Sequence, residues 1–503
     1  MVPVDRSNST PVDRSKPGVA DFLQLDPGDA PPGGLAAWLA GRLRRAVADG
    51  RLPVGGRLPP GRVLAEELRV SRGVVTEAYR RLIEDGQVEG RGRAGTFVVG
   101  APIAAGFCAP AAAAHSPAPA RTDFAVPPGP DVFDALRASP ARIDLTPGVP
   151  DLAAFPRSAW LRAERQVLGS LSPSGFGYGD PRGAPPLRRA VAHWLARYRG
   201  IRVEPQEVIV VTGVAQALGL VAQVLTAEGV REIAIEDPGS LGVRQHLRSQ
   251  RLRTPPIPVD AAGLRVDALR ASGAPVVALT PAHQFPTGVV LDGQRRRELV
   301  KWAHDEGGLI LEDDYDAEHR YDRPPVPAVH AMAPERIFYA GSVSKILAPA
   351  LRIGWLLAPP SHRDAIVDTK RFADLGNAVL PQLVLSELME SGELERHLRT
   401  LRRRHRRRRD AMIAAIGEHL PDAHVHGAAA GLHLMITFDA AIPDTELAAA
   451  ALERGVKAQP LSWHYQQPGN APGLVLGYAA ATASDAAEGI AIIGGILRRP
   501  GGR

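Results

Sequence analysis

The fold of this chain is decided by the stretch Tyr339-Ala340-Gly341-Ser342-Val343-Ser344-Lys345 and by Arg352, seven residues further on. A lysine amine suits imine chemistry when its surroundings lower its pKa or when a Schiff base already holds it. The hydroxyls of Ser342 and Ser344 and the fork of Arg352 can together bind a phosphate dianion. A Ser-x-Ser-Lys pattern alone is common, so its meaning depends on the rest of the chain.

An acidic run supports this interpretation. Glu312-Asp313-Asp314-Tyr315-Asp316 follows the apolar residues 309–311, which we expect to form a strand. A carboxylate at a strand end can pair with a protonated pyridine nitrogen, and a phenol two residues later can bond a ring oxygen. A divalent-metal loop is the alternative, but no spaced set of further oxygen ligands accompanies the run. We therefore predict no metal site.

A third segment, Thr212-Gly213-Val214-Ala215-Gln216, lies between an apolar strand at 208–211 and a helix. Free amides at a helix start can bind phosphate, although such a junction is usually structural. From 143 to 497, helical patterns alternate with short apolar strands, for example at 232–235 and Val276–Leu279. That alternation predicts a mostly parallel sheet covered by helices.

Composition limits the class of protein. A chain of 503 residues with 45% hydrophobic and 23% charged residues suits a soluble protein of two or three domains. The one cysteine, Cys108, excludes an internal disulfide framework and favours the reducing cytoplasm. No signal-peptide core is present, and no apolar run approaches the ~20 residues of a membrane helix. We predict a cytoplasmic protein with no membrane partner.

The net charge of +6 is unevenly spread. Residues 35–100 hold twelve arginines, no lysine and seven acidic residues, so most of the excess positive charge lies in this short segment. A small basic unit of this kind suggests a polyanionic partner, although a solvated basic surface has the same composition.

Composition and periodicity divide the chain into four parts. Residues 1–34 are polar and punctuated by Pro and Gly, which predicts a disordered tail. Residues 35–100 are compact in pattern. Residues 101–142 are rich in Ala and Pro without sustained periodicity, which predicts a linker. Residues 143–499 form the body that carries the lysine.

The basic unit has the pattern of a winged helix-turn-helix. Helices are expected at 35–49, at about 62–68 and from Ser71, which can cap the third helix, to Gly86. Two short strands, at 88–89 and 96–99, then flank a Gly- and Arg-rich turn. A recognition helix presents its first residues to base edges, and Arg72 there can donate two hydrogen bonds to a guanine. A three-helix module for binding protein is the alternative.

This unit resembles the DNA-binding domain of the GntR family. The likeness rests on stretches such as Arg62-Val63-Leu64-Ala65, Val70-Ser71-Arg72, Glu77 to Leu82 and Gly95 to Val98. By that resemblance the unit binds an operator in double-stranded DNA, and Arg69 stands where a glycine commonly makes the turn. The implied contact residues are Arg62, Ser71, Arg72, Gly73, Thr76 and, on the wing, Arg91, Arg93 and Thr96.

The body resembles fold-type I aminotransferases, and the whole chain resembles the MocR subfamily of GntR regulators. Matching stretches include Tyr178 to Pro181, Glu236 to Gly239, His283 to Gly288, Ser342 to Gly354 and Gly431 to Leu434. The resemblance implies pyridoxal phosphate as the cofactor and a homodimer with shared sites. It assigns the Schiff base to Lys345, the pyridine nitrogen to Asp313 and O3′ to Tyr315. The implied phosphate ligands are Ser342, Ser344, Arg352, Gly213, Val214, Ala215, Gln216 and, from the neighbouring subunit, Tyr178.

Two departures from the family bear on activity. Ser240 follows Pro238-Gly239 where the family usually has a tyrosine that stacks on the cofactor ring. Val475 stands where relatives that process amino acids hold an arginine for the substrate carboxylate. Both argue against turnover of an ordinary α-amino acid. Separately, the run of arginines from Arg402 to Arg409 resembles a nucleic-acid patch, but we favour a solvated face of a long helix.

Three functions follow from these observations. We favour a regulator whose body senses pyridoxal phosphate, alone or with an amine or amino-acid effector, and thereby changes operator binding. We expect such a regulator to control vitamin B6 or amino-acid metabolism. The second function is an active aminotransferase with an accessory DNA-binding unit. The third is a body that has lost the cofactor and serves only as a dimerisation scaffold.

Overall fold

The chain forms two compact units, Met1–Ala111 and Ala112–Arg503, which we call the head and the body. A computed structural model describes residues 23, 25–31, 34–99, 123–321, 326–439, 442–467 and 471–498, without the side chain of Arg93. Cys108, most of the predicted tail and much of the predicted linker therefore lie outside the described residues.

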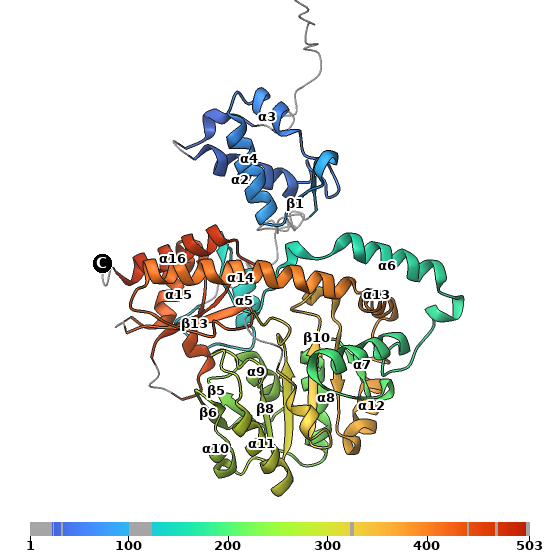
Figure 1. Ribbon diagram of the computed structural model, residues 1–503. Coiled ribbons are helices and arrows are strands. Elements are labelled where there is room, and N and C mark those ends of the chain that lie inside the picture. Colours follow the sequence, from blue (N-terminus) through green and yellow to red (C-terminus); the bar gives the residue numbers. More distant parts are fainter. Residues whose placement is uncertain are drawn as a thin grey trace, which may run out of the picture. The chain divides into compact units, whose positions relative to one another are not determined.

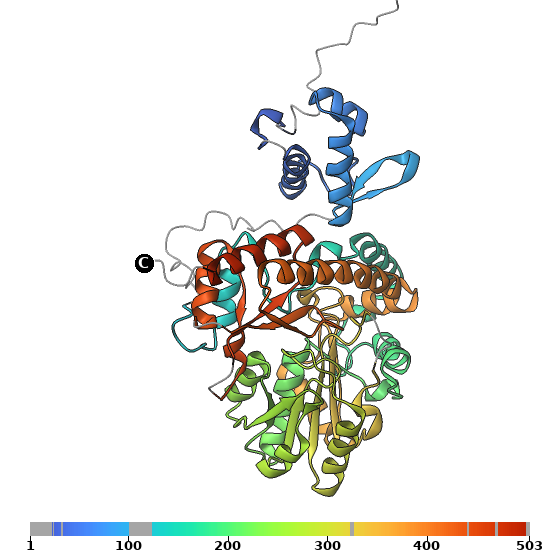
Figure 2. The same ribbon diagram turned by 60° about the vertical axis from the view of Figure 1, so that its left-hand side comes forward.

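The head is a winged helix-turn-helix, as predicted (Figures 1 and 2). Its elements are α2 (Leu35–Ala48), α3 (Gly61–Glu67), α4 (Arg72–Glu84), β1 (Val88–Gly90) and β2 (Thr96–Val98). The two strands pair antiparallel around a short 3-10 turn and form the wing. Leu39, Leu43 and Val47, spaced four apart on α2, are all buried in the core of the head.

The head core also includes two residues of the predicted tail. Leu23 and Leu25 are buried among the leucines of α2, α3 and α4. A short 3-10 turn, Pro27–Asp29, follows them in the chain. Two leucines in a polar segment are too few to produce a periodic pattern, but burying them against an existing core is favourable. For these residues the prediction of disorder was wrong.

The body contains a mostly parallel sheet, as predicted. Its strands are β4 (Ile209–Val211), β5 (Ala234–Asp237), β6 (Pro256–Asp260), β7 (Gly263–Leu264), β8 (Val276–Leu279), β9 (Leu309–Asp314), β10 (Ile337–Ser342) and β11 (Gly354–Leu357). Among the described residues eight strands lie in the order β4-β11-β10-β9-β8-β5-β6-β7. β10, β9, β8, β5 and β6 are parallel, whereas β11 is antiparallel to both of its neighbours. The parallel strands therefore bring the residues that follow β8, β9 and β10 to one edge.

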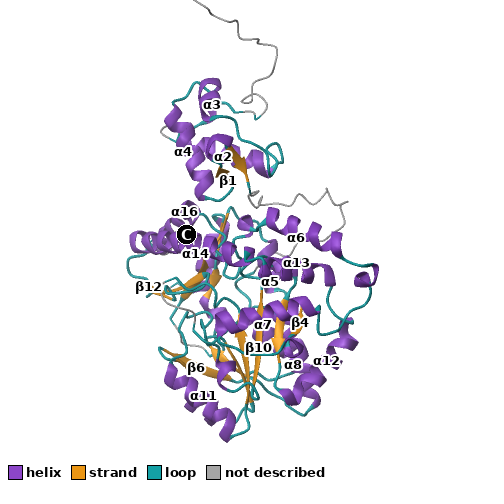
Figure 3. Ribbon diagram, turned by 45° about the vertical axis from the view of Figure 1, so that its right-hand side comes forward, coloured by secondary structure: helices purple, strands orange, loops and turns teal. Residues whose placement is uncertain are grey.

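Helices cover both faces of this sheet (Figure 3). They are α7 (Pro185–Arg199), α8 (Val214–Ala227), α9 (Leu241–Ser249), α10 (Val266–Ser272), α11 (Gly293–Asp305), α12 (Pro360–Asp374) and α13 (Val379–Glu390). α8, α9 and α12 pack on one face, and α7, α13, α10 and α11 on the other. α6 (Arg157–Ser170) packs against α13. Strands covered on both sides read as continuous apolar runs, which is the pattern seen in the sequence.

The C-terminal part of the body is a smaller subdomain. Its elements are α14 (Glu393–His419), α15 (Asp444–Glu453), α16 (Ala483–Leu497), β12 (His424–His426), β13 (His433–Thr437), β15 (Gln459–Pro460) and β16 (Gly473–Gly477). The four strands form one antiparallel sheet. Beside it, β3 (Ile143–Asp144) pairs with β14 (Val456–Lys457), which ties the entry of the body to its C-terminal part.

The predicted linker is shorter than 101–142. Residues 123–142 belong to the body and include the helix α5 (Val132–Ala138). Phe124, Val132 and Leu136 are buried in the core of the C-terminal subdomain. A helix of seven residues leaves little periodicity to detect, and the Ala- and Pro-rich residues before it masked the signal.

The arginine run lies on α14, but it is neither a solvated face nor a free nucleic-acid patch. Arg404 and Arg408 pair with the buried Asp151. Arg402, Arg406 and Arg409 donate to the backbone carbonyls of Glu318, Tyr321 and Ala428, respectively. Most of the run therefore ties loops of the body to α14.

Within the described ranges, no helix is both long enough and apolar enough to cross a membrane.

Candidate functional site

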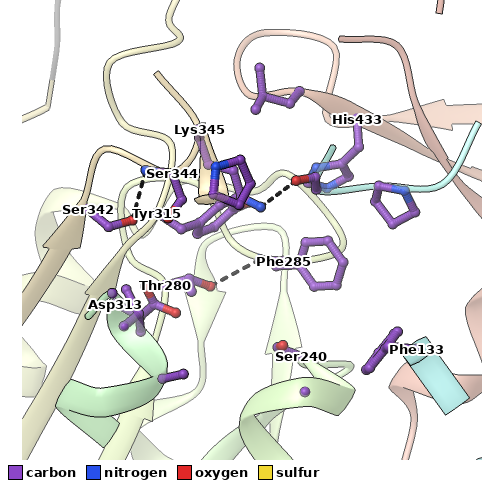
Figure 4. A pocket seen from close by; sticks show the side chains of 18 of the residues that line it. Phe133, Ser240, Thr280, Phe285, Asp313, Tyr315, Ser342, Ser344, Lys345 and His433 are labelled. Carbon is purple, nitrogen blue, oxygen red and sulfur yellow. Dashed lines mark hydrogen bonds between the residues drawn. The ribbon is translucent and has the colours of Figure 1, made fainter. Parts of the chain in front are cut away.

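A pocket of about 390 Å³ lies at the edge of the large sheet where β9 and β10 end. It contains nine of the residues that the sequence predicted for one site: Gly213, Val214, Ala215, Asp313, Tyr315, Ser342, Ser344, Lys345 and Arg352. Figure 4 shows Lys345, Ser342 and Asp313 along one side of the pocket and Phe133 and His433 on the other. The tertiary structure thus brings together segments that are more than 100 residues apart.

Lys345 follows β10 and reaches back toward the entry of the body. Its Nζ donates a hydrogen bond to the carbonyl of Gly148. Burial lowers the pKa of Lys345, and the carboxylates of Asp316 and Asp313 oppose that shift only in part. A lysine with a lowered pKa is a better nucleophile toward a carbonyl at neutral pH.

Asp313, on β9, carries an unsatisfied buried oxygen. Its Oδ1 has no hydrogen-bond partner among the described residues. Burial, and then the charges of Asp314 and Asp316, raise the pKa of Asp313 to about 7, while Lys345 opposes the shift. A buried carboxylate of this kind is costly unless a donor or a cation meets it. The pyridine N–H⁺ of pyridoxal phosphate is such a partner, so this residue fits the predicted cofactor.

Tyr315 is fixed in the same pocket by a histidine. Its hydroxyl lies 3.0 Å from Nδ1 of His283, which also lies 2.8 Å from Asp316 Oδ2. Burial, followed by the charge of Asp316, raises the pKa of Tyr315, so the phenol stays protonated and can donate to a ring oxygen.

The third side of the pocket suits a phosphate. Ser342, Ser344 and Arg352 line it together with the first turn of α8. Gly213 has a φ of 93°, and a Cβ there would lie 3.5 Å from Nη1 of Arg352, so the turn and the guanidinium are neighbours. Arg352 is exposed and forms no ion pair with any described residue. Helix-start amides, two hydroxyls and a free guanidinium are the groups that bind a phosphate dianion.

Two predicted phosphate ligands do not line the pocket. Gln216 accepts from the backbone amide of Thr212 and donates to Asp374, so its side chain is used within the fold. The assignment of Gln216 to the phosphate therefore stays a prediction from the sequence. Tyr178 lies outside the pocket and is 94% exposed.

The pocket also contains residues that the sequence predictions missed. Phe285 and His433 lie in two of the stretches that resemble the family, His283 to Gly288 and Gly431 to Leu434, so the sequence offered a signal for their place in the pocket. Phe133 lies on α5, inside the predicted linker, and no sequence signal pointed to it. Ser240 lines the pocket and its Oγ caps α9 by accepting from the amide of Val243. Residue 240 itself therefore supplies no aromatic ring.

Three buried groups at the pocket have the spacing of metal ligands. His283, Asp316 and His433 offer ligand atoms within 4.8 Å of one another. Nδ1 of His283 is bonded to Asp316, and Nε2 of His433 donates to the carbonyl of Pro286 at 3.1 Å. These bonds orient the two rings around Tyr315, and Nε2 of His283 has no partner among the described residues.

The head presents a separate candidate surface. Arg62 on α3 and Arg72, Gly73 and Thr76 on α4 are all exposed. Ser71 is the N-cap residue of α4, but its side chain makes no capping hydrogen bond and is also exposed. A Cβ at Gly73 would meet only the Ser71 hydroxyl, at 3.7 Å, so the head itself does not require a glycine there. The first turn of α4 is therefore free to meet a partner.

The wing and the turn before α4 complete this surface. Arg91 is exposed, lies 3.3 Å from Glu89 and stacks over the ring of Phe97. Thr96 is half-buried in β2. Arg69 adopts a φ of 53°, the left-handed conformation that a glycine would take more easily. The arrangement is that of a recognition helix flanked by a basic wing.

The fold and the pocket define a class: a DNA-binding head joined to an aminotransferase body. Residues 35–98 match the family "Bacterial regulatory proteins, gntR family", and residues 141–473 match "Aminotransferase class I and II". The body is similar to a kynurenine aminotransferase from Pyrococcus horikoshii, with 26% identity, a TM-score of 0.67, and coverage of 73% of this chain and 93% of that one. Class I and II aminotransferases depend on pyridoxal phosphate, so the family of the body implies that cofactor.

Two relatives match this chain over both the head and the body. The chain is 32% identical to the "Probable rhizopine catabolism regulatory protein MocR" of Rhizobium meliloti, over 89% of this chain and 91% of the relative. It is 30% identical to the "HTH-type pyridoxine biosynthesis transcriptional regulator PdxR" of Corynebacterium glutamicum, over 89% and 92%. The chain belongs to the MocR-type regulators of the GntR family, which confirms the predicted resemblance and favours a regulator over an enzyme.

Proposed function

We propose that this regulator binds pyridoxal phosphate on Lys345 and that occupancy of the pocket changes how the head binds its operator. The observation that carries the proposal is the shared pocket of Lys345 and the unpartnered carboxylate of Asp313. A phosphate-binding side completes it with Ser342, Ser344 and Arg352.

Each residue has a definite part in holding the cofactor. Lys345 supplies the amine for the covalent link, Asp313 holds a proton on the pyridine nitrogen, and Tyr315 donates to the ring oxygen. When bound, the cofactor supplies an aldehyde that combines reversibly with amines. The same chemistry that serves an enzyme therefore also serves a sensor of the cofactor or of an amine.

An active aminotransferase remains the second candidate, because Lys345 and Asp313 are both present. Val475 stands where relatives that process amino acids hold an arginine for the substrate carboxylate. Its side chain is fully buried in an apolar cluster with Met435 and Leu461. Ser240 supplies no ring to stack on the cofactor. Sustained release of keto acid from a panel of amino acids would favour the enzyme over the sensor.

We place the start of the coupling between the pocket and the head in α5. Phe133 on α5 lines the pocket, and α5 lies in residues 123–142, the first described segment of the body. A ligand that contacts Phe133 therefore contacts the part of the body that comes nearest to the DNA-binding unit in the sequence. Because such coupling is reciprocal, operator binding should change ligand affinity by the same factor.

Arg72 is the residue on which specific DNA recognition is expected to depend. We expect Arg72→Ala to weaken binding to the cognate operator by roughly 1–3 kcal/mol, since a bidentate contact to guanine would be lost. The matched control is Arg45→Ala, which removes the same charge from an exposed position on α2. Electrophoretic mobility shifts at fixed salt measure both. Equal affinities for the two variants would contradict this placement of the recognition helix.

We propose a homodimer from the exposed apolar side chains of the body. Tyr178 is 94% exposed, Phe176 is 59% exposed, and Leu161 and Leu168 on α6 are each nearly half exposed. In the dimer Tyr178 would reach the phosphate in the neighbouring subunit. Light scattering is expected to give about twice the chain mass of 53.5 kDa. A monomer at micromolar concentration would rule out shared sites.

We propose that the regulated genes serve vitamin B6 or amino-acid metabolism, because of the cofactor and the name of the PdxR relative. A cytoplasmic location fits a protein that meets both DNA and this cofactor. Footprinting upstream of the protein's own gene is the experiment that identifies the operator.

A further inference from the structure

One wall of the pocket, opposite Lys345, is neutral and largely apolar. It is formed by Phe133, Phe285, Leu432, His433, Gln459 and His464. Phe285 packs edge-on against His464, with ring centroids 5.0 Å apart. Figure 4 shows Phe133, Phe285 and His433 on this side, away from Asp313. This wall is the surface that a ligand bound next to the cofactor would meet.

Cations are scarce in this pocket. Among the described residues that line it, Lys345 and Arg352 are the charged bases, and the proposed function assigns both to the cofactor. Burial, and in each case a nearby base, lower the pKa values of His433 and His464 to about 3, so both rings are neutral at pH 7. A carboxylate placed here would lose its hydration without gaining a cation, which is costly.

The available polar atoms suit a donor rather than an anion. Nδ1 of His464 has its shortest contact, 3.1 Å, with the carbonyl of Gly239, so Nδ1 donates there. Its Nε2 is then a buried acceptor with no partner among the described residues. The carbonyl of Gly148, which accepts from Lys345, adds further negative potential. Both acceptors favour an ammonium group over a carboxylate.

The neighbouring strand supplies no hidden cation. Val475 on β16 is packed with Met435 and Leu461, and Phe285 and Tyr465 lie against this cluster. Arg244, behind the pocket wall, donates to the carbonyls of Tyr465 and Trp463. Its guanidinium therefore serves the loop that carries His464.

From this wall we infer that the ligand recognised beside the cofactor is a primary amine with an aromatic or aliphatic body and no carboxylate on its amine-bearing carbon. The inference rests on the proposed function, because it takes the cofactor to occupy Lys345 and Arg352. Phe133 is the contact for the body of the amine. Its ring lies near the start of α9, where a Cβ at Gly242 would be 3.7 Å from it.

The test compares two probes that differ only in the carboxylate: 2-phenylethylamine and phenylalanine. The full-length protein, loaded with pyridoxal phosphate and dialysed, is titrated with each by calorimetry while its absorption spectrum is recorded. We expect the amine to bind at least tenfold more tightly than the amino acid. Equal binding, tighter binding of phenylalanine, or no binding of the amine would overturn the inference.

A pair of variants on α5 tests the contact itself. Phe133→Ala is expected to weaken amine binding at least fivefold, whereas Val132→Ala, whose side chain lies in the core instead, should change it less than twofold. If both variants weaken amine binding equally, α5 acts only through its packing in the body and Phe133 is not a ligand contact. If the wild-type protein takes up no cofactor, the proposed function fails and the inference with it. Uptake of cofactor with a preference for phenylalanine overturns the inference alone.

Discussion

Lys345→Ala is expected to abolish the absorption band near ~420 nm that a protein-bound imine of pyridoxal phosphate gives. Lys345 is the lysine among the described residues that line the pocket, and its Nζ donates to the carbonyl of Gly148. Without an amine at this position no covalent link forms, and only the phosphate and ring contacts remain. The variant should therefore bind the cofactor weakly and lose it on dialysis.

Lys301→Ala is the matched control, because Lys301 is exposed on α11 and pairs only with Asp305. It should keep the band unchanged. The same samples should be used for operator binding with and without added cofactor. If added cofactor changes operator binding by the wild-type protein but not by Lys345→Ala, the effect of the cofactor depends on its attachment to Lys345. A colourless wild-type protein that never takes up the cofactor would contradict the proposal.

Arg199→Met is expected to destabilise the body by about 3–5 kcal/mol, because it leaves a buried carboxylate without its cation. Arg199 ends α7 and Asp314 ends β9, and their side chains are only 1% and 2% exposed. Tyr339 donates to the same carboxylate oxygen, and Arg199 also donates to the carbonyl of Val326. For a unit of this size the thermal midpoint should fall by roughly 5 °C.

Two further variants identify the cause of that loss. Arg197→Ala removes a mostly exposed pair with Glu395, so it should cost less than about 1 kcal/mol. Arg199→Met combined with Asp314→Asn removes the buried charge while keeping an acceptor for Tyr339, and should recover more than half of the stability. A double variant as unstable as Arg199→Met would show that packing of the arginine, not charge, is responsible. Calorimetric unfolding measures all three proteins.

Much of the candidate site followed from local sequence. Asp313 and Tyr315 were predictable because they come directly after an apolar strand, and Ser342, Ser344 and Lys345 because they lie together after another. Parallel strands bring such ends to one edge of a sheet, so the meeting of these segments also followed. The side chain of Gln216, in contrast, bonds to Thr212 and Asp374, and Gln216 does not line the pocket. Local sequence does not specify that choice.

The sequence by itself determined the class of both units, the residues at the strand ends and the basic character of the head. These depend on periodicity, turn residues and short-range motifs, which are properties of neighbouring residues. Only the tertiary structure decided that Phe133 joins the pocket and that most of the arginines of α14 are tied to the body. It also decided that Leu23 and Leu25 belong to the head. Such contacts join residues far apart in the chain, and their free energy comes from burial and pairing that exist only once the chain has folded.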